Sequence, residues 1–297
     1  MILLTAPRLA EAVPCPYLPG RRFAQEYFFA AKAAPEELGS LLRAGWRRFG
    51  RFYFRPGCPG CRSCVPLRVD AAALEPTASQ RRVLRKGAGV SVSVAEPRPT
   101  DEAWEVYRRH GEGRFGKSPD REDFERSFFD DGVPSLAVEY RVEGSLAGLG
   151  FLDRTDDGLS SAYFAFDPDF SRYSLGTLSV FAEAALARRL GLEWYYLGYW
   201  VAGCRSMEYK GRFAPHQLYD WESGAWLDAE EWSGRQAEDV LEGDVGQVGR
   251  EEPGALPAAE PAAPVRGDEK PEGTEDQDHR GEMEEEEAAG HRQGTGQ

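Results

Sequence analysis

The chain has 297 residues, of which 12% are aromatic and 29% charged, and its formal net charge is −14 at pH 7. This length allows two ordinary domains with cores. No apolar run approaches the roughly 18 residues that a membrane helix needs, and the start of the chain lacks the features of a signal peptide. Five cysteines, three of them within residues 58–64, suit a reducing compartment better than a disulfide framework. We therefore expect a cytoplasmic protein with no membrane partner.

The charge is distributed very unevenly along the chain. Residues 1–95 carry a net charge of +9, residues 96–228 carry −9, and residues 229–297 carry −14. Only one aromatic residue, Trp232, lies in the last segment. These shifts predict a small basic N-terminal domain over 1–95, a second domain over 96–228, and an acidic tail over 229–297.

In the first segment the pattern predicts one helix and several short strands. Leu38, Leu41 and Leu42 recur at helical spacing behind Pro35, which predicts a helix over 35–46. Residues 46–55 interleave aromatics with arginines around a glycine and indicate a hairpin with a basic face. Residues 65–69 and 90–94 have the pattern of strands, and residues 77–86 form a polar, basic segment between them.

The second segment begins with two predicted helices, over 100–110 and 119–129, and Thr100 is a good cap for the first. Three strands over 135–142, 145–152 and 159–166, a helix over 175–190 and a strand over 194–200 follow. This is the order of an acyltransferase of the N-acetyltransferase (GNAT-like) type, in an α+β protein. In such folds the loop over 167–176 lies at the start of a helix, where backbone N–H groups suit a phosphate.

The third segment has little apolar periodicity and is rich in Pro, Ala, Gly and Glu. Such a composition cannot bury enough apolar surface to offset the loss of chain entropy, so we expect a disordered tail. We favour a solvated tail over one that competes with nucleic acid for the basic domain.

Three cysteines, Cys58, Cys61 and Cys64, follow one another at metal-ligand spacing. With Cys15 as a fourth ligand, they could bind zinc or an iron–sulfur cluster as thiolates. The local pattern is incomplete, because Arg68 stands where a ferredoxin-like run would need a further cysteine. Buried or redox-sensitive thiols therefore remain an equal alternative.

Two further clusters contain candidate binding residues. Arg81, Arg82, Arg85 and Lys86 place four cations in six residues, which favours contact with the phosphates of a nucleic acid over a merely solvated helix face. Residues 195–213 predict a buried strand that leads into a loop with Lys210 and its neighbours, and strand ends of this kind often hold functional sites.

These residues also show a family resemblance. Cys15 with Tyr17-Leu18-Pro19, Gly45-Trp46-Arg47-Arg48, the cysteine run over 55–68, and Ser79-Gln80-Arg81-Arg82 resemble the N-terminal region of the bacterial aminoacyl-tRNA–protein transferases. Residues 163–168, Ser174-Leu175-Gly176, Leu197-Gly198-Tyr199-Trp200 and residues 207–215 resemble their C-terminal region. The short architecture is more similar to the aspartate/glutamate leucyltransferase branch than to the arginyltransferases. Leu18 stands where eukaryotic relatives have the second cysteine of a CxxC motif.

The resemblance implies an enzyme that moves an amino acid from aminoacyl-tRNA to the N-terminal amine of proteins that begin with Asp or Glu, which marks them for degradation. Leucine is the expected amino acid, and the chemistry requires no cofactor, because the donor is already an activated ester. The resemblance and the chemistry of acyl transfer together suggest three groups of site residues. The catalytic group is Tyr163, Tyr209 and Lys210; the substrate-binding group is Arg68, Arg82, Asp167, Lys210 and Arg212; the tRNA-binding group is Arg47, Arg48, Arg81, Arg85, Lys86 and Arg172.

Three alternatives remain open at this point. An arginyltransferase would have the same acceptors but would need buried carboxylates, such as Asp167 and Asp169, around the donor side chain. A coenzyme A-dependent N-acetyltransferase would share the second domain but would leave the basic domain unexplained. A non-catalytic RNA-binding or metal-sensing protein would explain the basic domain but not the acyltransferase order of elements.

Overall fold

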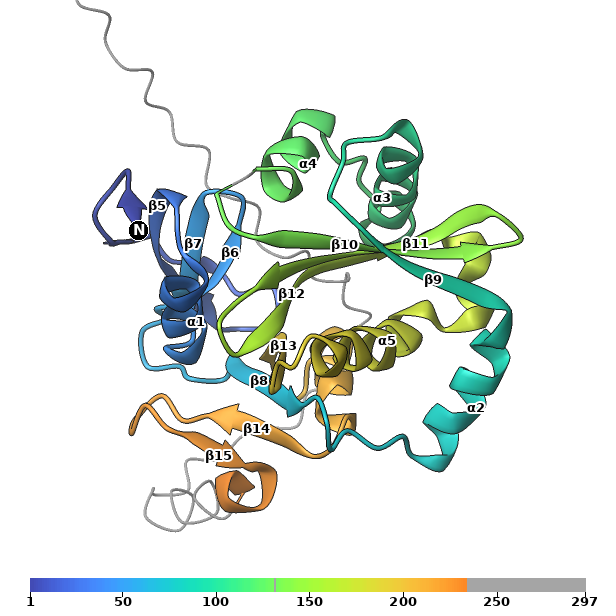
Figure 1. Cartoon of the computed structure of the whole chain (residues 1–297). Helices are drawn as coiled ribbons and strands as arrows, with labels where there is room; N and C mark the ends of the chain where they lie inside the picture. Colours follow the sequence, from blue (N-terminus) through green and yellow to red (C-terminus); the bar gives the residue numbers. More distant parts are fainter. Residues whose placement is uncertain (131, 234–297) are drawn as a thin grey trace, which may run out of the picture. The chain divides into compact units, whose positions relative to one another are not determined.

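The computed structural model describes residues 1–130 and 132–233, and all of these residues belong to one compact unit (Figure 1). The predicted disorder of the acidic tail concerns residues that lie, apart from 229–233, outside this described part. Among the described residues, no helix has both the length and the apolar character needed to cross a membrane.

Eight strands form one mixed sheet in the order β15-β14-β8-β13-β12-β11-β10-β9. Neighbouring strands are antiparallel except β12 and β13, which run parallel. The strands are β8 (Val65–Asp70), β9 (Val90–Ala95), β10 (Ser135–Val142), β11 (Ser145–Arg154), β12 (Gly158–Phe166), β13 (Trp194–Trp200), β14 (His216–Tyr219) and β15 (Trp226–Asp228). Because the chain enters β13 through a long helix after β12, it crosses one face of the sheet between the two parallel strands.

Helices cover both faces of this sheet (Figure 1). On one face, α3 (Asp101–Phe115) and α4 (Arg121–Phe128) pack on β10 and β11 through an aromatic core. On the other face, α5 (Leu175–Arg189) packs on β12 and β13, with α2 (Ala78–Lys86) beside it. The short elements are the 3₁₀ turns η1 (Gly87–Gly89), η2 (Pro168–Tyr173) and η3 (Tyr209–Arg212), and the helix α6 (Arg205–Glu208).

The predicted order of elements in the second segment is confirmed, and with it the α+β class of the fold. The Thr100 side chain caps α3 by accepting a hydrogen bond from the backbone N–H of Ala103. The segment over 77–86, predicted only as polar and basic, is the helix α2, which begins with a capping box between Thr77 and Gln80.

The first 56 residues form a separate, smaller sheet. It has the order β1-β5-β7-β6, with β2 also pairing with β5, and α1 packs against it. Its elements are β1 (Ile2–Leu3), β2 (Arg8–Leu9), β5 (Gln25–Lys32), α1 (Pro35–Arg43), β6 (Arg47–Phe49) and β7 (Phe52–Pro56), and the pair β3 (Val13–Pro14) and β4 (Arg22–Phe23) lies apart from it. The helix over 35–46 and the hairpin over 46–55 are confirmed, and Gly50 turns the hairpin at φ +53°.

The large sheet contains strands from both sides of residue 95, where the sequence predicts a domain boundary. Strands β8 and β9 precede that position, yet β8 pairs with β13 and β14, and β9 pairs with β10. The two parts of the chain therefore share backbone hydrogen bonds as well as side-chain contacts.

A buried ion pair joins the small sheet to the large one. The Arg48 guanidinium on β6 donates to Asp153 on β11 through Nε at 2.9 Å and Nη2 at 2.5 Å. Arg48 also donates to the Gly50 carbonyl and to the Ser135 hydroxyl. Both charged side chains are almost fully shielded from solvent, so the bidentate geometry is needed to offset the loss of hydration.

We expect Arg48→Met to lower the free energy of unfolding by about 3–5 kcal/mol, because it leaves the Asp153 carboxylate buried with the Ser135 hydroxyl as donor but without its charged partner. Arg51→Met is the matched control, since Arg51 pairs with Asp130 from an exposed position and exposed pairs contribute about 1 kcal/mol or less. Urea denaturation of the two variants measures the difference. Equal losses in both variants would show that the Arg48 pair does not hold the sheets together.

Candidate active site

The parallel strands β12 and β13 part soon after they meet. Their paired positions are Gly158 with Trp194, Leu159 with Tyr195, and Ser160 with Tyr196. Beyond Ser160 the two strands make no further pairing with each other, and β13 continues alongside β8. A gap between two strands of a sheet leaves main-chain polar groups that need other partners.

Two side-chain cations take up partners in this gap. Arg47 on β6 donates from Nη2 to the Ser161 carbonyl on β12, and Lys210 in η3 donates from Nζ to the Tyr199 carbonyl on β13 at 2.9 Å. Gly198 lies between them with φ +83°, a conformation that favours glycine. A Cβ atom at Gly198 would lie 3.5 Å from Arg47 Nη2 and 3.6 Å from Lys210 Nζ. Both cations therefore adjoin the same point of β13.

The electrostatics of this pair are unusual because, among the described residues, neither cation forms an ion pair with a carboxylate, and Asp153 acts on Arg47 through its charge without a direct contact. Burial lowers the pKa of Lys210 to about 7, and the charges of Arg47 and Arg114 act in the same direction. Burial also lowers the pKa of Arg47. In the described part of the chain, none of these three cations forms an ion pair with a carboxylate. An anion bound beside these cations would relieve their repulsion and restore the charge of Lys210.

Tyr209 and Arg114 belong to the same cluster. Burial raises the pKa of Tyr209, while the charge of Arg114 lowers it and that of Glu183 raises it. Arg114 lies in the last turn of α3 with an exposed side chain. The sequence analysis missed Arg114, because a basic residue in the last turn of a helix is ordinary. It did name Tyr209 and Lys210, which are consecutive in the chain and are both acted on by the charge of Arg114.

Tyr163 lies in a different environment from Tyr209. Its ring contacts a cluster of aromatic side chains on the face covered by α3 and α4, at centroid distances of 5.4–6.5 Å. One of these neighbours, His110, has a pKa that burial lowers to about 4, so it is neutral at physiological pH. Its ring nitrogen lies 3.1 Å from the Phe166 carbonyl oxygen.

Arg68, one of the residues expected to bind substrate, is held within the protein. Its guanidinium carbon lies 3.7 Å from the ring centroid of Trp194 and 4.4 Å from that of Trp226. Its Nε and Nη2 atoms donate to the Gln217 side chain. These contacts fix Arg68 between two indole rings, as in a cation–π stack.

The other residues expected to bind substrate lie apart from Arg68. Arg82 on α2 and Arg212 in η3 are exposed. Asp167, at the start of η2, is buried and pairs with Arg109 at 3.0 Å, and Arg109 also pairs with Asp169 at 2.7 Å. One arginine thus neutralises both of the carboxylates at the entrance to the loop over 167–176.

The residues expected to bind tRNA fall into two groups. Arg81, Arg85 and Lys86 are exposed on α2, and Arg172 is exposed in η2, where its guanidinium carbon lies 4.9 Å from the Tyr173 ring centroid. Arg48 is buried and Arg47 is half-buried, with the partners described above. Although adjacent in the sequence, these two arginines make different contacts, because successive residues of a strand point to opposite faces.

Three of the four cysteines expected to bind metal, Cys15, Cys58 and Cys61, take part in hydrogen bonds within the protein. Cys15 Sγ accepts from the backbone N–H of Tyr17 and Leu18, and Cys58 Sγ contacts the backbone of Ala24. Burial raises the pKa of the Cys58 and Cys64 thiols. Across residues 1–130 and 132–233, no three His, Cys, Asp or Glu side chains are placed to hold one metal ion. The charges of Cys15, Cys58 and Cys61 all act on Cys64, and a zinc or iron–sulfur site at these cysteines stays a prediction.

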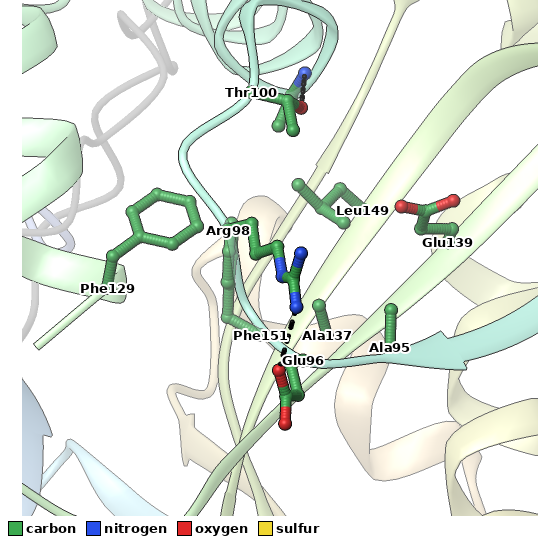
Figure 2. A pocket seen from close by; sticks show the side chains of 10 residues that line it. Ala95, Glu96, Arg98, Thr100, Phe129, Ala137, Glu139, Leu149 and Phe151 are labelled. Carbon is green, nitrogen blue, oxygen red and sulfur yellow. Dashed lines mark hydrogen bonds and ion pairs between the residues drawn. The ribbon is translucent and has the colours of Figure 1, made fainter. Parts of the chain in front are cut away.

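A cavity of about 400 Å³ lies on the α3 side of the sheet (Figure 2). Its lining includes Phe129, Leu149 and Phe151, together with the charged residues Glu96, Arg98 and Glu139. These charges are already paired: Arg98 binds Glu96 at 3.1 Å, and Glu139 binds Arg141 at 3.0 Å. The cavity therefore lacks the unbalanced charge that distinguishes the gap between β12 and β13.

Comparison with known proteins gives consistent matches along the described part of the chain. Residues 13–82 match the family model described as the N terminus of arginine-tRNA-protein transferase, and residues 102–220 match the model of its C terminus. An aspartate/glutamate leucyltransferase of Chromobacterium violaceum is 36% identical over 219 residues, which are 72% of this chain and 89% of that protein. One of Thiobacillus denitrificans is 37% identical over 229 residues, 73% of this chain and 92% of that protein. Among solved structures, a GCN5-related N-acetyltransferase from Kribbella flavida aligns with a TM-score of 0.32 and 16% identity, over 56% of this chain and 54% of that chain.

The lowered pKa of Lys210 predicts how stability depends on pH. Between about pH 7 and the ordinary lysine value of 10.5, the native state binds fewer protons at Lys210 than the unfolded state does, so this residue makes the free energy of unfolding rise with pH. As the pH falls through 7, Lys210 becomes protonated in the native state as well, and this gain in the free energy of unfolding is lost. We expect Lys210→Met to remove this rise, as measured by urea denaturation at pH 7 and pH 9. The same rise in the wild type and the variant would mean that Lys210 keeps an ordinary pKa.

Proposed function

Because the chain belongs to the arginine-tRNA–protein transferase family, we propose that it transfers an amino acid from charged tRNA to the N-terminal amine of a protein. Its relatives named aspartate/glutamate leucyltransferase support leucine as the amino acid and Asp or Glu as the first residue of the acceptor. The observation in the structure that carries the proposal is the cation pair without a counter-charge, Arg47 and Lys210, at the parting of β12 and β13.

The reaction is the aminolysis of an ester. The α-amine nitrogen attacks the carbonyl carbon that joins the amino acid to the 3′-terminal ribose of the tRNA, an amide bond forms, and the ester C–O bond breaks. The ribose hydroxyl leaves with a proton, and the attacking nitrogen loses one. An α-amine has a pKa of about 7.7–8.0, so part of it is already neutral and nucleophilic at physiological pH. The enzyme must mainly hold the reactants together and stabilise the oxyanion.

Arg47 and Lys210 are our proposed site for the acidic side chain of the acceptor. A carboxylate in the space beside Gly198 would lie within hydrogen-bond reach of both cations, since neither is far from the position of a Cβ atom there. Binding would provide the counter-charge that the cluster lacks and would return Lys210 to its protonated form. A neutral or basic first residue would leave the two cations unpaired, and this is the basis of the selectivity.

We propose that Tyr209 stabilises the oxyanion or relays a proton. It directly precedes Lys210 in the chain, and the charge of Arg114 acts on both residues. Burial raises the pKa of Tyr209, with the charge of Arg114 acting against this rise, so the hydroxyl keeps its proton and can donate a hydrogen bond. Tyr163 is the alternative on the opposite, aromatic side of β12. The two tyrosines would approach a substrate from different faces of the sheet.

Leucine is favoured over arginine as the donor by the charges near the loop over 167–176. A pocket for an arginine side chain needs free carboxylates, but Asp167 and Asp169 already share Arg109. Phe164 and Phe166 lie near this loop at the end of β12 and pack into the apolar core beside α5. They provide the kind of lining that an aliphatic side chain requires.

For the tRNA we propose the exposed face of α2 together with Arg172. Arg81, Arg85 and Lys86 project from α2 without carboxylate partners among the described residues, and α2 packs beside α5, the helix that follows the donor loop. Arg82 and Arg212 are exposed as well and remain open to either substrate. A polyanion of this size is attracted by such a cluster over a distance of about 10 Å.

The proposal is tested by transfer of labelled amino acid from leucyl-tRNA and arginyl-tRNA to peptides that differ only in their first residue: Asp, Glu, Lys or Ala. We expect label from leucyl-tRNA on the Asp and Glu peptides alone. Label from arginyl-tRNA would retain the mechanism and overturn leucine as the donor. No label from either, together with acetylation from acetyl-coenzyme A, would favour an N-acetyltransferase instead.

We expect Lys210→Met to lower kcat/KM for the Asp peptide by about 30- to 1,000-fold, because loss of one charged partner in a buried site costs about 2–4 kcal/mol. The KM for leucyl-tRNA should stay unchanged. Lys86→Met, which removes an exposed cation of α2, is the matched control and should affect only the KM for tRNA. Equal effects of both variants on both substrates would contradict the assignment of Lys210 to the acceptor.

A further inference from the structure

A buried carboxylate lies next to the parting of β12 and β13 and has no part in the reaction described so far. Glu183 on α5 is fully buried. Its Oε1 accepts a hydrogen bond from the Tyr140 hydroxyl at 3.0 Å, and its Oε2 accepts one from the Tyr195 hydroxyl at 2.5 Å. Gly150 on β11 makes room for it, since a Cβ atom there would lie only 2.4 Å from Oε1.

No cation in the described part of the chain pairs with Glu183. Burial raises the pKa of this carboxyl to about 7, although the two tyrosine hydroxyls act in the opposite direction. Both tyrosines are themselves fully buried. An apolar side chain at this position of α5 would avoid the cost of a buried acid. Packing alone therefore does not explain why a carboxylate lies at this position of α5.

The two tyrosines lie in different places relative to the site. Tyr195 is the second residue of β13 and belongs to the short parallel stretch that precedes the gap. Burial raises the pKa of Tyr195, whereas a hydrogen bond with Ser161 lowers it. The carbonyl of the same Ser161 accepts from Arg47. Tyr140, in contrast, lies on β10, two strands away from β12.

We propose that Glu183 is a positioning residue for the acceptor site and that it acts through Tyr195. By holding the Tyr195 hydroxyl it fixes β13 to α5 at the point where β12 and β13 part. The Tyr195 oxygen in turn accepts a hydrogen bond from the Ser161 hydroxyl. This extends the constraint to β12, where the Ser161 carbonyl holds Arg47. The spacing between Arg47 and Lys210 is thus set from the helix that follows the donor loop. The proposal rests on the proposed function for the identity of the acceptor.

Tyr195→Phe and Tyr140→Phe provide a matched pair of variants. Each removes one hydroxyl from a fully buried ring that donates to the same carboxylate, so their effects on stability should be similar. We expect Tyr195→Phe to raise the KM for the Asp peptide by about tenfold or more, because small displacements of binding groups are costly. Tyr140→Phe should change it by less than about twofold, and the KM for leucyl-tRNA should stay the same in both.

A double variant tests whether Glu183 acts through Tyr195. Glu183→Gln keeps the shape of the side chain but only one accepting oxygen, and we expect it to raise the KM for the Asp peptide on its own. Added to Tyr195→Phe, it should raise the KM no further, since both changes break one chain of contacts. Equal KM effects of the two tyrosine variants, or additive effects in the double variant, would overturn the proposal.

A second measurement does not depend on the substrate. The pKa of Lys210, followed by NMR of labelled lysine side chains and assigned with Lys210→Met, should move back toward its ordinary value in Tyr195→Phe as the cations separate. It should not move in Tyr140→Phe. If the wild type transfers no leucine to Asp peptides, the proposed function fails, but this titration still decides the positioning role. An unmoved Lys210 in Tyr195→Phe would refute it.

Discussion

Where β12 and β13 part, two backbone carbonyls accept hydrogen bonds from side-chain cations. Arg47 reaches the Ser161 carbonyl from the small sheet, and Lys210 reaches the Tyr199 carbonyl from the segment after β13. Satisfying buried carbonyls is obligatory, but satisfying them with cations leaves positive charge without a counter-ion. The two carbonyls thus have hydrogen-bond donors while the two cations lack a carboxylate partner among the described residues, and the proposed site for an acidic substrate rests on this imbalance.

The imbalance lowers stability, and other parts of the molecule offset it. Arg48, which follows Arg47 in the chain, does have a carboxylate partner. Asp153 binds it in a bidentate pair that joins the two sheets. The hairpin of β6 and β7 thus carries one cation that stabilises the fold, Arg48, and one that belongs to the proposed acceptor site, Arg47. Glu183 adds a second costly group on the other side of the gap. Such costs at binding sites are the usual exchange of stability for function.

Much of this fold can be predicted from the sequence, because the periodicity of residues 96–228 is strong and each element buries a clear face. The position of β8 beside β13 could not be predicted, since nothing local tells which distant strands pair. In the site, Lys210 stood out because of its motif. The different roles of Arg47 and Arg48 could not be told apart, because they depend on Asp153, which is more than 100 residues away. Nothing in the sequence pattern distinguished Arg114 from an ordinary basic residue at the end of a helix.

The near-neutral pKa of Lys210 has a consequence for the proposed reaction. An acceptor arrives with its side chain as a carboxylate and its amine largely as an ammonium ion. The carboxylate makes protonation of Lys210 more favourable, because it adds the missing negative charge to the cluster. The amine must lose a proton before it attacks. Once the acidic side chain is bound, Lys210 can take up the proton that the amine releases. On this mechanism the same charge that identifies the acceptor also helps to activate it, and a neutral first residue would supply neither effect.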